Sequence, residues 1–589
     1  MAIKGRANKM VQASNYMDGR VSRTKVGRHF KWRSTFSSGY MIPFWCDEIL
    51  PGQTKSVDLG ELVRSITPLG PTMDNSFLDL FFFFVPNRLL WDHWEEFIAG
   101  YNKEAWTQDV VYEVPQIKLA DDEDPSFSTT YDDDDFIHSF YDYLPGLGNP
   151  VDLVQAINTF AAMPYSTNEE IANKEAFAKK INDVFGFSAL YPRAFVKIWN
   201  DWFRDENLQD EYQLYTGDSD ELASSFAFNL IDGDAIPKMA KYHNRFTSLL
   251  PQPQKGPDVL IPMDNLQIGV PAEYSYFHGL AIGDDGELSI GQIGTSNPFN
   301  TTVYPTGESD AAPLVAQNIS NTIRQLRLAT QTELLLARDA RGGTRYVESL
   351  LSHFGVHNGD ARLQRSEYLG SKQIPLQVMQ VTNTSSSDGA VLGNVGGQSV
   401  TKDNSHYFLK SFSEHGIVFC VGGVRTNISY SHGIRKMYQR KGRFDYIWPE
   451  FKHLGDVACY KKEYQQIYFT KVGGSWLTRL IDSDEVFGYT PYGSELREGY
   501  NFNNGLFRDN ATGSLSYLTY QESLMFGNKR TGNSTKVILS DKYIQQDSNI
   551  VSGTLVDQSG PQFYALFDLY SEDVIPLDPT SDPGLMDHF

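Results

Sequence analysis

Hydrophobic residues along this 589-residue chain fall into many short runs, and these runs predict strands more often than helices. Residues 76–86 are typical, because Phe81–Val85 is a β-favouring apolar run that ends at Pro86. From about 375 to 560, similar runs are separated by Gly, Asn and Ser, as at 417–421 and 464–469. Strands spread over the whole length predict one β-sandwich core with long insertions.

Helices are predicted between these strands, where apolar residues repeat at the spacing of one helical face. Asn168 is a candidate N-cap for the second of them, and Gly186 lies just past its end. Gly342 and Gly343 are expected to stop the last one. The predicted helices are 90–98, 169–185, 192–204 and 321–338.

Two segments differ from their surroundings in composition. Residues 119–150 are rich in Asp and also carry Pro and Gly, so they are predicted to be an acidic loop. Residues 257–321 contain no Lys or Arg, eight acids and many Gly and Pro. We interpret them as a long insertion with short strands and turns.

Charge is distributed unevenly along the chain. The net charge is -22, but residues 1–33 hold nine basic residues against one acid, Asp18, a net charge of +8. Residues 1–35 are therefore predicted to be an extended basic N-terminal arm that meets a polyanion. The body itself is predicted, from its acidic charge, to bind nucleic acid poorly. The nine candidate nucleic-acid-binding residues are Lys4, Arg6, Lys9, Arg20, Arg23, Lys25, Arg28, Lys31 and Arg33.

The chemistry of this arm fits contact with DNA. Lys and Arg neutralise phosphates without reading a sequence, and bases can stack on rings such as Phe30, Trp32 and Phe36, which lie near the last charges. The alternative is an arm that only ties neighbouring subunits together, and the two roles are compatible.

Catalytic and metal-binding patterns are missing from the sequence. It contains no P-loop, GxSxG or HExxH motif. Its three cysteines include no CxxC pair, and Gly355 separates His353 from His357, so that pair is interpreted as a turn with two ordinary histidines. The longest apolar run is far too short to span a bilayer, and the N-terminus lacks an apolar signal-peptide core. We predict no enzyme activity, metal, cofactor or membrane insertion.

Local strings from about residue 40 to 510 are more informative than composition. They include IPFWCDEILPG (42–52), TPLGPTMDN (67–75), FFFFVPNRLLWDHWEEFIAG (81–100), YPRAFVKIWNDWFRDENLQD (191–210), FTSLLPQPQKG (246–256), ARDARGGTRY (337–346), SHFGV (352–356), DARLQRSEYLG (360–370), FDYIWPEFKHLG (444–455), FGYTPYGSELR (487–497) and GLFRD (505–509). In sequence and in order, these blocks resemble the major capsid proteins of the microviruses, and in particular their gokushovirus branch.

This resemblance implies a mainly β fold, an eight-stranded antiparallel jelly-roll sandwich with long loop insertions that contain short helices. It implies that residues 36–589 are one capsid domain, of which sixty copies form a T=1 icosahedral shell, through pentamer intermediates, around circular single-stranded DNA. The basic arm would face the interior, and 257–321 would be a surface protrusion that contacts the bacterial host receptor. Other phage structural, pilot or scaffolding proteins would be partners, with assembly in the host cytoplasm.

Two classes of alternative function remain. A jelly-roll carbohydrate-binding module or glycoside-processing enzyme would use the many aromatics and acids, but it gives the basic arm no role. Another viral structural protein is the second alternative. A scaffold would be helical and charged throughout, and a spike would not need a basic arm.

Overall fold

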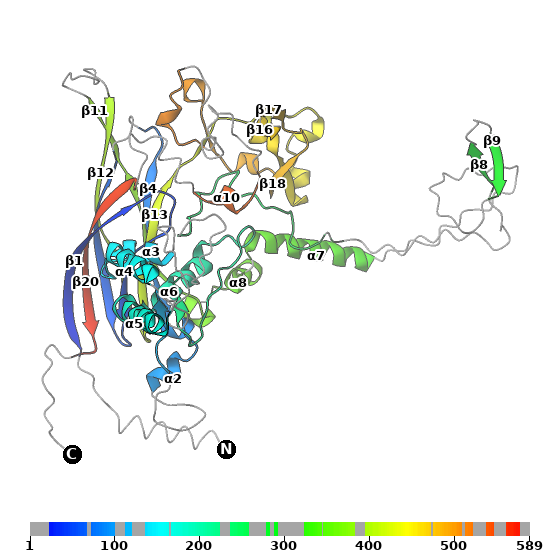
Figure 1. The fold of residues 1–589 in the computed structure, drawn as a ribbon. Helices are drawn as coiled ribbons and strands as arrows, with labels where there is room; N and C mark the ends of the chain where they lie inside the picture. The colour runs from blue at the N-terminus through cyan, green and yellow to red at the C-terminus, as the bar shows by residue number, and fades with distance from the viewer. Residues whose placement is uncertain are drawn as a thin grey trace, which may run out of the picture. The chain divides into compact units, whose positions relative to one another are not determined.

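The computed structural model covers most of the chain (Figure 1). It describes residues 23–66, 72–99, 112–119, 136–163, 167–223, 236–257, 259, 278–282, 288–292, 323–343, 345–357, 359–382, 395–472, 475–508, 513–521, 538–546 and 561–577. Within these residues, no helix is both long enough and apolar enough to cross a membrane. Cys46, Cys420 and Cys459 are free thiols.

Two antiparallel sheets pack face to face and form the core (Figure 1). The first consists of β1 (Thr24–Phe36), β3 (Thr54–Ser65), β11 (Val378–Thr382), β12 (Val395–Ser411) and β20 (Phe563–Ile575), in the order β1-β20-β3-β12-β11. The second consists of β2 (Ile42–Ile49), β4 (Ser76–Pro86), β10 (Glu367–Leu376) and β13 (Gly416–Thr426), in the order β10-β4-β13-β2.

The chain crosses between the two sheets at six of the eight connections between these strands, as is typical of an antiparallel jelly roll, so the predicted fold class is confirmed. The described residues place nine strands in these sheets, whereas eight were predicted. The ninth arises because β10 and β11 are separated only by Gln377: the chain leaves the second sheet there and joins the first.

The two sheets bury their residues differently. Alternate residues of β3 and β20 are buried, whereas nearly every residue of β4 and β13 is buried. Helices cover the second face of the four-stranded sheet: the ring of Phe140 lies 6.4 Å from that of Phe419 on β13, and the ring of Phe195 lies 6.3 Å from it. The outward residues of the five-stranded sheet keep their contact with solvent.

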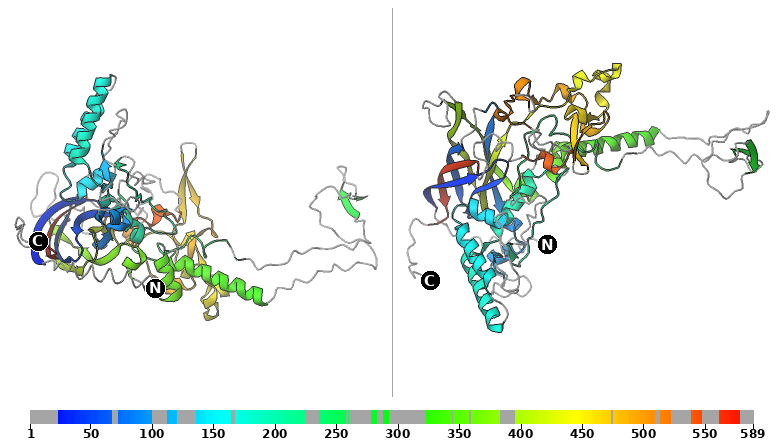
Figure 2. Two further views of the ribbon diagram at one scale, coloured as in Figure 1. Left: turned by 90° about the horizontal axis from the view of Figure 1, so that it is seen from below. Right: turned by 45° about the horizontal axis from the view of Figure 1, so that its top comes forward.

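A long insertion joins β4 to β10 and holds most of the helices. In it, α4 and α5 pack side by side (Figures 1 and 2). Its elements outside residues 254–342 are η1 (Asn87–Leu89), α2 (Trp94–Ala99), β5 (Gln116–Lys118), α3 (Phe136–Tyr143), α4 (Pro150–Ala162), α5 (Asn168–Phe185), β6 (Phe187–Ser188), α6 (Leu190–Ile198), the π-helical turn η2 (Trp199–Phe203), β7 (Glu221–Leu222), α8 (Tyr346–Phe354) and η3 (Asp360–Leu363).

A second insertion joins β13 to β20 and consists of short strands and 3₁₀ turns. Its elements are β14 (Ser429–Tyr430), η4 (Lys436–Tyr438), η5 (Arg443–Asp445), η6 (Pro449–His453), β15 (Asp456–Tyr460), η7 (Lys461–Glu463), β16 (Ile467–Val472), β17 (Ser475–Leu480), β18 (Val486–Pro491), η8 (Ser494–Leu496), β19 (Asn501–Phe502), η9 (Gly505–Phe507), η10 (Ser516–Leu518) and α10 (Asp541–Ile544).

Residues 254–342 form a second compact unit. Its described elements are an antiparallel hairpin of β8 (His278–Ile282) and β9 (Leu288–Gln292), and α7 (Ile323–Gly342). The predicted protrusion 257–321 falls entirely within this unit. Its position on the shell surface stays a prediction. The predicted acidic loop 119–150 is wrong at 136–143, where α3 forms because Phe140 and Tyr141 are buried in the core. Residues 120–135 of that loop lie outside the described residues.

The predicted helices form, with shifted ends. The helix predicted over 90–98 begins only at Trp94, because Asn87–Leu89 make a separate 3₁₀ turn. The N-cap of α5 is Thr167 rather than Asn168, because the Thr167 hydroxyl accepts the Glu170 backbone N–H and the Glu170 carboxylate accepts the Thr167 N–H.

The predicted arm, 1–35, overlaps β1, which begins at Thr24 and pairs with β20 along its whole length. The rings of Trp32 and Phe36 point into the core, where Trp32 stacks on Phe567 at 5.1 Å. They are buried, so bases cannot stack on them. The charges between these rings concealed the two-residue alternation of a strand with one buried face.

Candidate nucleic-acid interface

The nine predicted nucleic-acid-binding residues fall into three groups. Lys4, Arg6, Lys9 and Arg20 lie outside the described residues, and Arg23 is exposed just before β1. Strand β1 carries the other four, Lys25, Arg28, Lys31 and Arg33. Because successive side chains of a strand point to opposite faces, Arg28 lies on the inward face and the other three lie on the outward face.

Arg28 lies on the inward side of β1 and, although its side chain is 43% exposed, joins an ion cluster whose Lys55 and Asp573 are buried. Its guanidinium lies 2.8 Å from Asp573 and also contacts Asp47. Lys55, fully buried, places its Nζ 2.5 Å from Asp47 and 3.1 Å from Asp573. Since Asp47 belongs to β2 and the other three residues to the five-stranded sheet, this cluster ties the sheets together.

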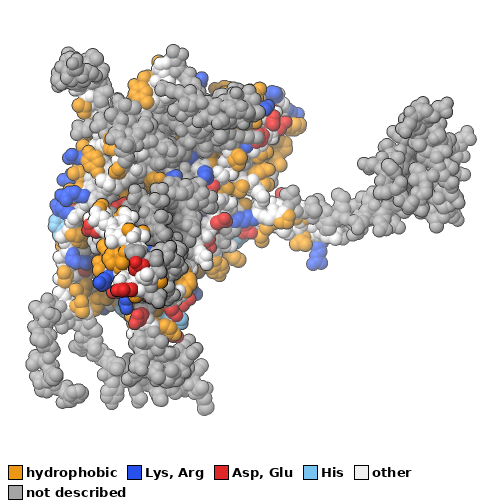
Figure 3. Space-filling model, viewed as in Figure 1, with side chains coloured by type: hydrophobic (Ala, Val, Ile, Leu, Met, Phe, Trp, Pro, Cys, Tyr) orange, Lys and Arg blue, Asp and Glu red, His pale blue; other side chains and the backbone are white. Residues whose placement is uncertain are grey.

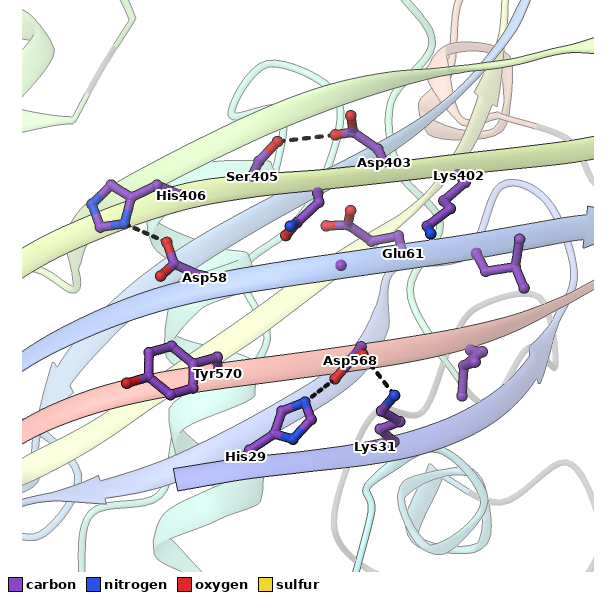
Figure 4. Close-up of a pocket in the computed structure, with 14 residues that line it drawn as sticks. His29, Lys31, Asp58, Glu61, Lys402, Asp403, Ser405, His406, Asp568 and Tyr570 are labelled. Atoms are coloured by element: carbon purple, nitrogen blue, oxygen red, sulfur yellow. Dashed lines mark hydrogen bonds and ion pairs between the residues drawn. The ribbon is translucent and has the colours of Figure 1, made fainter. Parts of the chain in front are cut away.

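The other β1 residues share the outward face of the five-stranded sheet with β20, β3 and β12 (Figure 4). The strand register aligns the outward side chains in rows that cross four strands. Each row is given in the strand order β1, β20, β3, β12. The first row holds His29, Tyr570, Asp58 and His406, and the second holds Lys31, Asp568, Gly60 and Asn404. The third holds Arg33, Leu566, Leu62 and Lys402, and the fourth holds Thr35, Tyr564, Arg64 and Val400.

The acids on this face are already paired with basic side chains. Hydrogen bonds from Lys31, at 2.9 Å, and from His29, at 2.5 Å, lower the pKa of Asp568 below its ordinary value. Two further pairs are His406 with Asp58, at 2.8 Å, and Lys25 with Glu572, at 2.5 Å. These pairs leave little net negative charge to repel an anion.

Three cations on the same face are left over. Arg33, Arg64 and Lys402 are exposed, and none pairs with a carboxylate of the residues that the structure describes. Tyr564 and Tyr570, 45% and 43% exposed, lie among them. Lys and Arg side chains gather along the β1 and β20 side of the molecule in Figure 3. Unpaired cations next to exposed rings can hold phosphates and stack bases.

Two hollows lie next to each other along this face. The larger, about 610 Å³, includes the first two rows, and the smaller, about 450 Å³, lies toward Tyr564 and Arg64. Both are lined by Leu62 and Leu566, which form a ridge between them. The face is therefore an uneven groove along the strands rather than a flat sheet.

Sequence reasoning missed most of this face. Arg64, Lys402, Asn404, Tyr564 and Tyr570 lie far from the arm in sequence, and only the strand register brings them beside β1. The sequence of a single strand shows which of its residues share the outward face, because these residues alternate. It does not show which other strands pair with it.

Metal-ligand chemistry is not evident in the described part of the chain. No group of three or more His, Cys, Asp and Glu side chains there could hold an ion. His353 lies in the last turn of α8, which ends at Gly355 in the left-handed conformation, so His357 lies beyond the helix.

Known proteins similar to this chain are phage coat proteins. The family model described as "Capsid protein (F protein)" matches residues 14–137 and 153–585. The capsid protein VP1 of Chlamydia phage 1 is 32% identical, with 96% of each chain covered. Those of Bdellovibrio phage phiMH2K and Spiroplasma virus 4 are 33% and 28% identical, over 86% and 97% of this chain and 87% and 97% of their own lengths. The chain thus belongs to the phage F-protein capsid family, as the resemblance to gokushovirus coat proteins predicted, and is a structural shell subunit rather than an enzyme.

Proposed function

We propose that this coat protein packages single-stranded DNA and that the outward face of its five-stranded sheet lies against the genome. The observation that carries the proposal is the set of unpaired cations, Arg33, Arg64 and Lys402, beside two exposed tyrosines. The basic residues of 1–23 precede β1 in the sequence and add to this contact.

The chemistry of the face suits a single strand. Phosphates are neutralised by Lys and Arg in any sequence context, as the packaging of a whole genome requires. The exposed rings of Tyr564 and Tyr570 offer stacking surfaces, and only unpaired bases have faces free to use them. The rest of the chain is strongly acidic, so this face and the arm are the parts that attract DNA.

Sixty copies in a T=1 shell, assembled through pentamers in the bacterial cytoplasm with companion phage proteins, complete this proposal. The support is membership of the capsid family over nearly the whole chain. Sedimentation and negative-stain imaging of the protein, co-expressed with the other structural proteins of its phage, are expected to give closed shells of one size. Protein that stays monomeric under those conditions would contradict the shell proposal.

We also propose that residues 257–321 contact the host surface. They belong to a separate compact unit, and they carry eight acids and no Lys or Arg, unlike the outward face of the five-stranded sheet. Particles with substitutions at 280–310 should assemble normally but attach poorly to host cells. If each such substitution blocks assembly instead, the segment is a subunit interface.

Removing the three unpaired cations tests the DNA contact. The variant with Arg33→Gln, Arg64→Gln and Lys402→Gln should bind an oligonucleotide of thymidine more weakly. The slope of log affinity against log salt should fall by about 2, because three phosphate contacts are lost. Fluorescence anisotropy over a series of salt concentrations measures both quantities.

A matched control removes the same number of positive charges from a surface outside the sheet. Lys179, Lys180 and Lys452 are exposed, and they lie on α5 and η6, outside the sheet. Their replacement by Gln should leave the salt slope near that of the unmodified protein. Equal slopes for both triple variants would mean that charge in general, and not this face, attracts DNA.

A further inference from the structure

Gly60 forms the floor of the larger hollow. It sits in the middle of the second row, between Asp568 on β20 and Asn404 on β12. Every neighbouring position in the first and third rows carries a full side chain, so the missing side chain at Gly60 leaves a depression in the sheet. Figure 4 shows the side chains of both rows around it. The absence of a side chain at this one position therefore contributes directly to the depression.

The fold itself does not require glycine there. Gly60 is not among the glycines with positive φ. A Cβ on Gly60 would lie 3.6 Å from the nearest atoms of Asp568 and 3.7 Å from Asn404 Oδ1, which is ordinary van der Waals contact. A Cβ can thus be added at this position without displacing its neighbours.

The two walls of the hollow differ in chemistry. One wall is polar and consists of the first row, in which His406 pairs with Asp58 and the exposed ring of Tyr570 stands between the strands. The opposite wall is the ridge formed by Leu62 and Leu566. A ligand that fills this space needs an apolar face toward the leucines and polar edges toward the other wall.

Two groups able to recognise such a ligand, the Asn404 amide and the Lys402 ammonium, have no partner among the described residues. The Asn404 amide, which can both donate and accept, is exposed at one side of Gly60, and no described residue hydrogen-bonds to it. Lys402, also unpaired, and Lys31 stand at the two ends of the hollow. An amide beside an apolar ridge and near cations matches a nucleotide: a base has flat apolar faces, hydrogen-bonding edges and an attached phosphate.

We propose that the hollow over Gly60 receives one unstacked base of the packaged single strand. The base lies against Leu62 and Leu566, its edge meets the Asn404 amide, and its phosphate reaches Lys402. The neighbouring hollow, between Arg33 and Arg64, continues the groove along the strands, as an extended polymer requires and a compact small molecule does not. This inference rests on the proposed packaging of DNA.

Filling the hollow is the test. Gly60→Val should leave the fold intact or stabilise it, because a β-branched residue favours a strand and glycine does not. Thymidine oligonucleotides and abasic oligonucleotides of the same length are the two probes for the full-length protein. The unmodified protein should prefer the thymidine strand by about ten-fold, and Gly60→Val should lose that preference but keep its affinity for the abasic strand.

Two further variants make the result decisive. Ser56→Val adds a similar side chain on the same face of β3, outside the hollow, and should keep the preference. Asn404→Ala removes an exposed amide without filling the hollow, and should weaken the preference, so the test does not depend on the folding of Gly60→Val.

The outcomes separate this inference from the proposed function. If Gly60→Val and Asn404→Ala bind both probes as the unmodified protein does, the hollow holds no base, although DNA binding stands. If the unmodified protein binds neither probe, the DNA-packaging proposal fails, and this inference fails with it.

Discussion

Replacing Lys55 with alanine is expected to lower the free energy of unfolding by about 3–5 kcal/mol. Lys55 is fully buried between the sheets and contacts the carboxylates of both Asp47 and Asp573. Without its ammonium group, only Arg28 opposes two carboxylates, and Asp573 is almost completely buried. Urea unfolding of the unassembled protein, followed by tryptophan fluorescence, measures the loss.

Lys31→Ala is the matched control for this prediction. Lys31 also pairs with an acid of β20, Asp568 at 2.9 Å, but on the exposed face of the sheet. Exposed pairs contribute little, so a loss below about 1 kcal/mol is expected. A similar loss for both variants would show that the buried cluster does not stabilise the sandwich more than a surface pair does.

Glu61→Gln is expected to stabilise the protein at pH 8 and to flatten the pH dependence of its stability. Burial raises the pKa of Glu61 from 4.5 to about 7, because the charged carboxylate loses its hydration inside the sandwich. Its Oε1 accepts a hydrogen bond of 2.6 Å from the Tyr407 hydroxyl, whereas its buried Oε2 has no partner.

The sign of this effect follows from the two pKa values of Glu61. The unfolded chain releases the proton near pH 4.5 and the folded chain only near pH 7, so the folded state binds more protons between these values. Stability therefore falls as the pH rises from about 4.5 to 7, and the ionised carboxylate costs about 3 kcal/mol above that range.

Glutamine removes this penalty and keeps the acceptor for Tyr407. Its amide group remains a buried polar group without a described partner, so the expected gain at pH 8 is about 2 kcal/mol, falling toward zero at pH 4. Urea midpoints at several pH values measure it. The exposed Glu450 provides the control, and Glu450→Gln should change neither the midpoint nor its pH slope. A Glu61→Gln variant with an unchanged slope would contradict the buried charge.

Local patterns predicted the strands that are buried on both faces. The run Phe81–Val85 and the proline after it reveal β4 without any partner strand. Strand β1 was missed because its outward lysines and arginines resemble a basic arm. Only its pairing with β20, more than 500 residues later, makes it part of a sheet.

The candidate site was predicted only in part, for the same reason. Lys31 and Arg33 were chosen for their charge, and they lie on the DNA-facing sheet of the proposal. Arg28 was chosen on the same ground, but the pleat turns it into the buried cluster. Arg64 and Lys402 come from strands whose neighbours depend on the whole topology, which no local pattern contains.

The high aromatic content, which had supported a carbohydrate-binding alternative, has a structural explanation. Phe82, Phe83 and Phe195 are buried, and their rings contact other aromatic rings between the sheets and under the helices. Rings used in this way stabilise the core and offer no platform for a sugar. Family membership, shown over nearly the whole chain, likewise supports the structural function.

An icosahedral cryo-electron microscopy reconstruction of DNA-filled particles tests the central proposal most directly. Sixty copies are expected, each with the outward face of its five-stranded sheet toward the interior and with density for the genome beside Arg33, Arg64 and Lys402. A particle in which this face points to the exterior, or is buried against a neighbouring subunit, would contradict the proposed DNA contact.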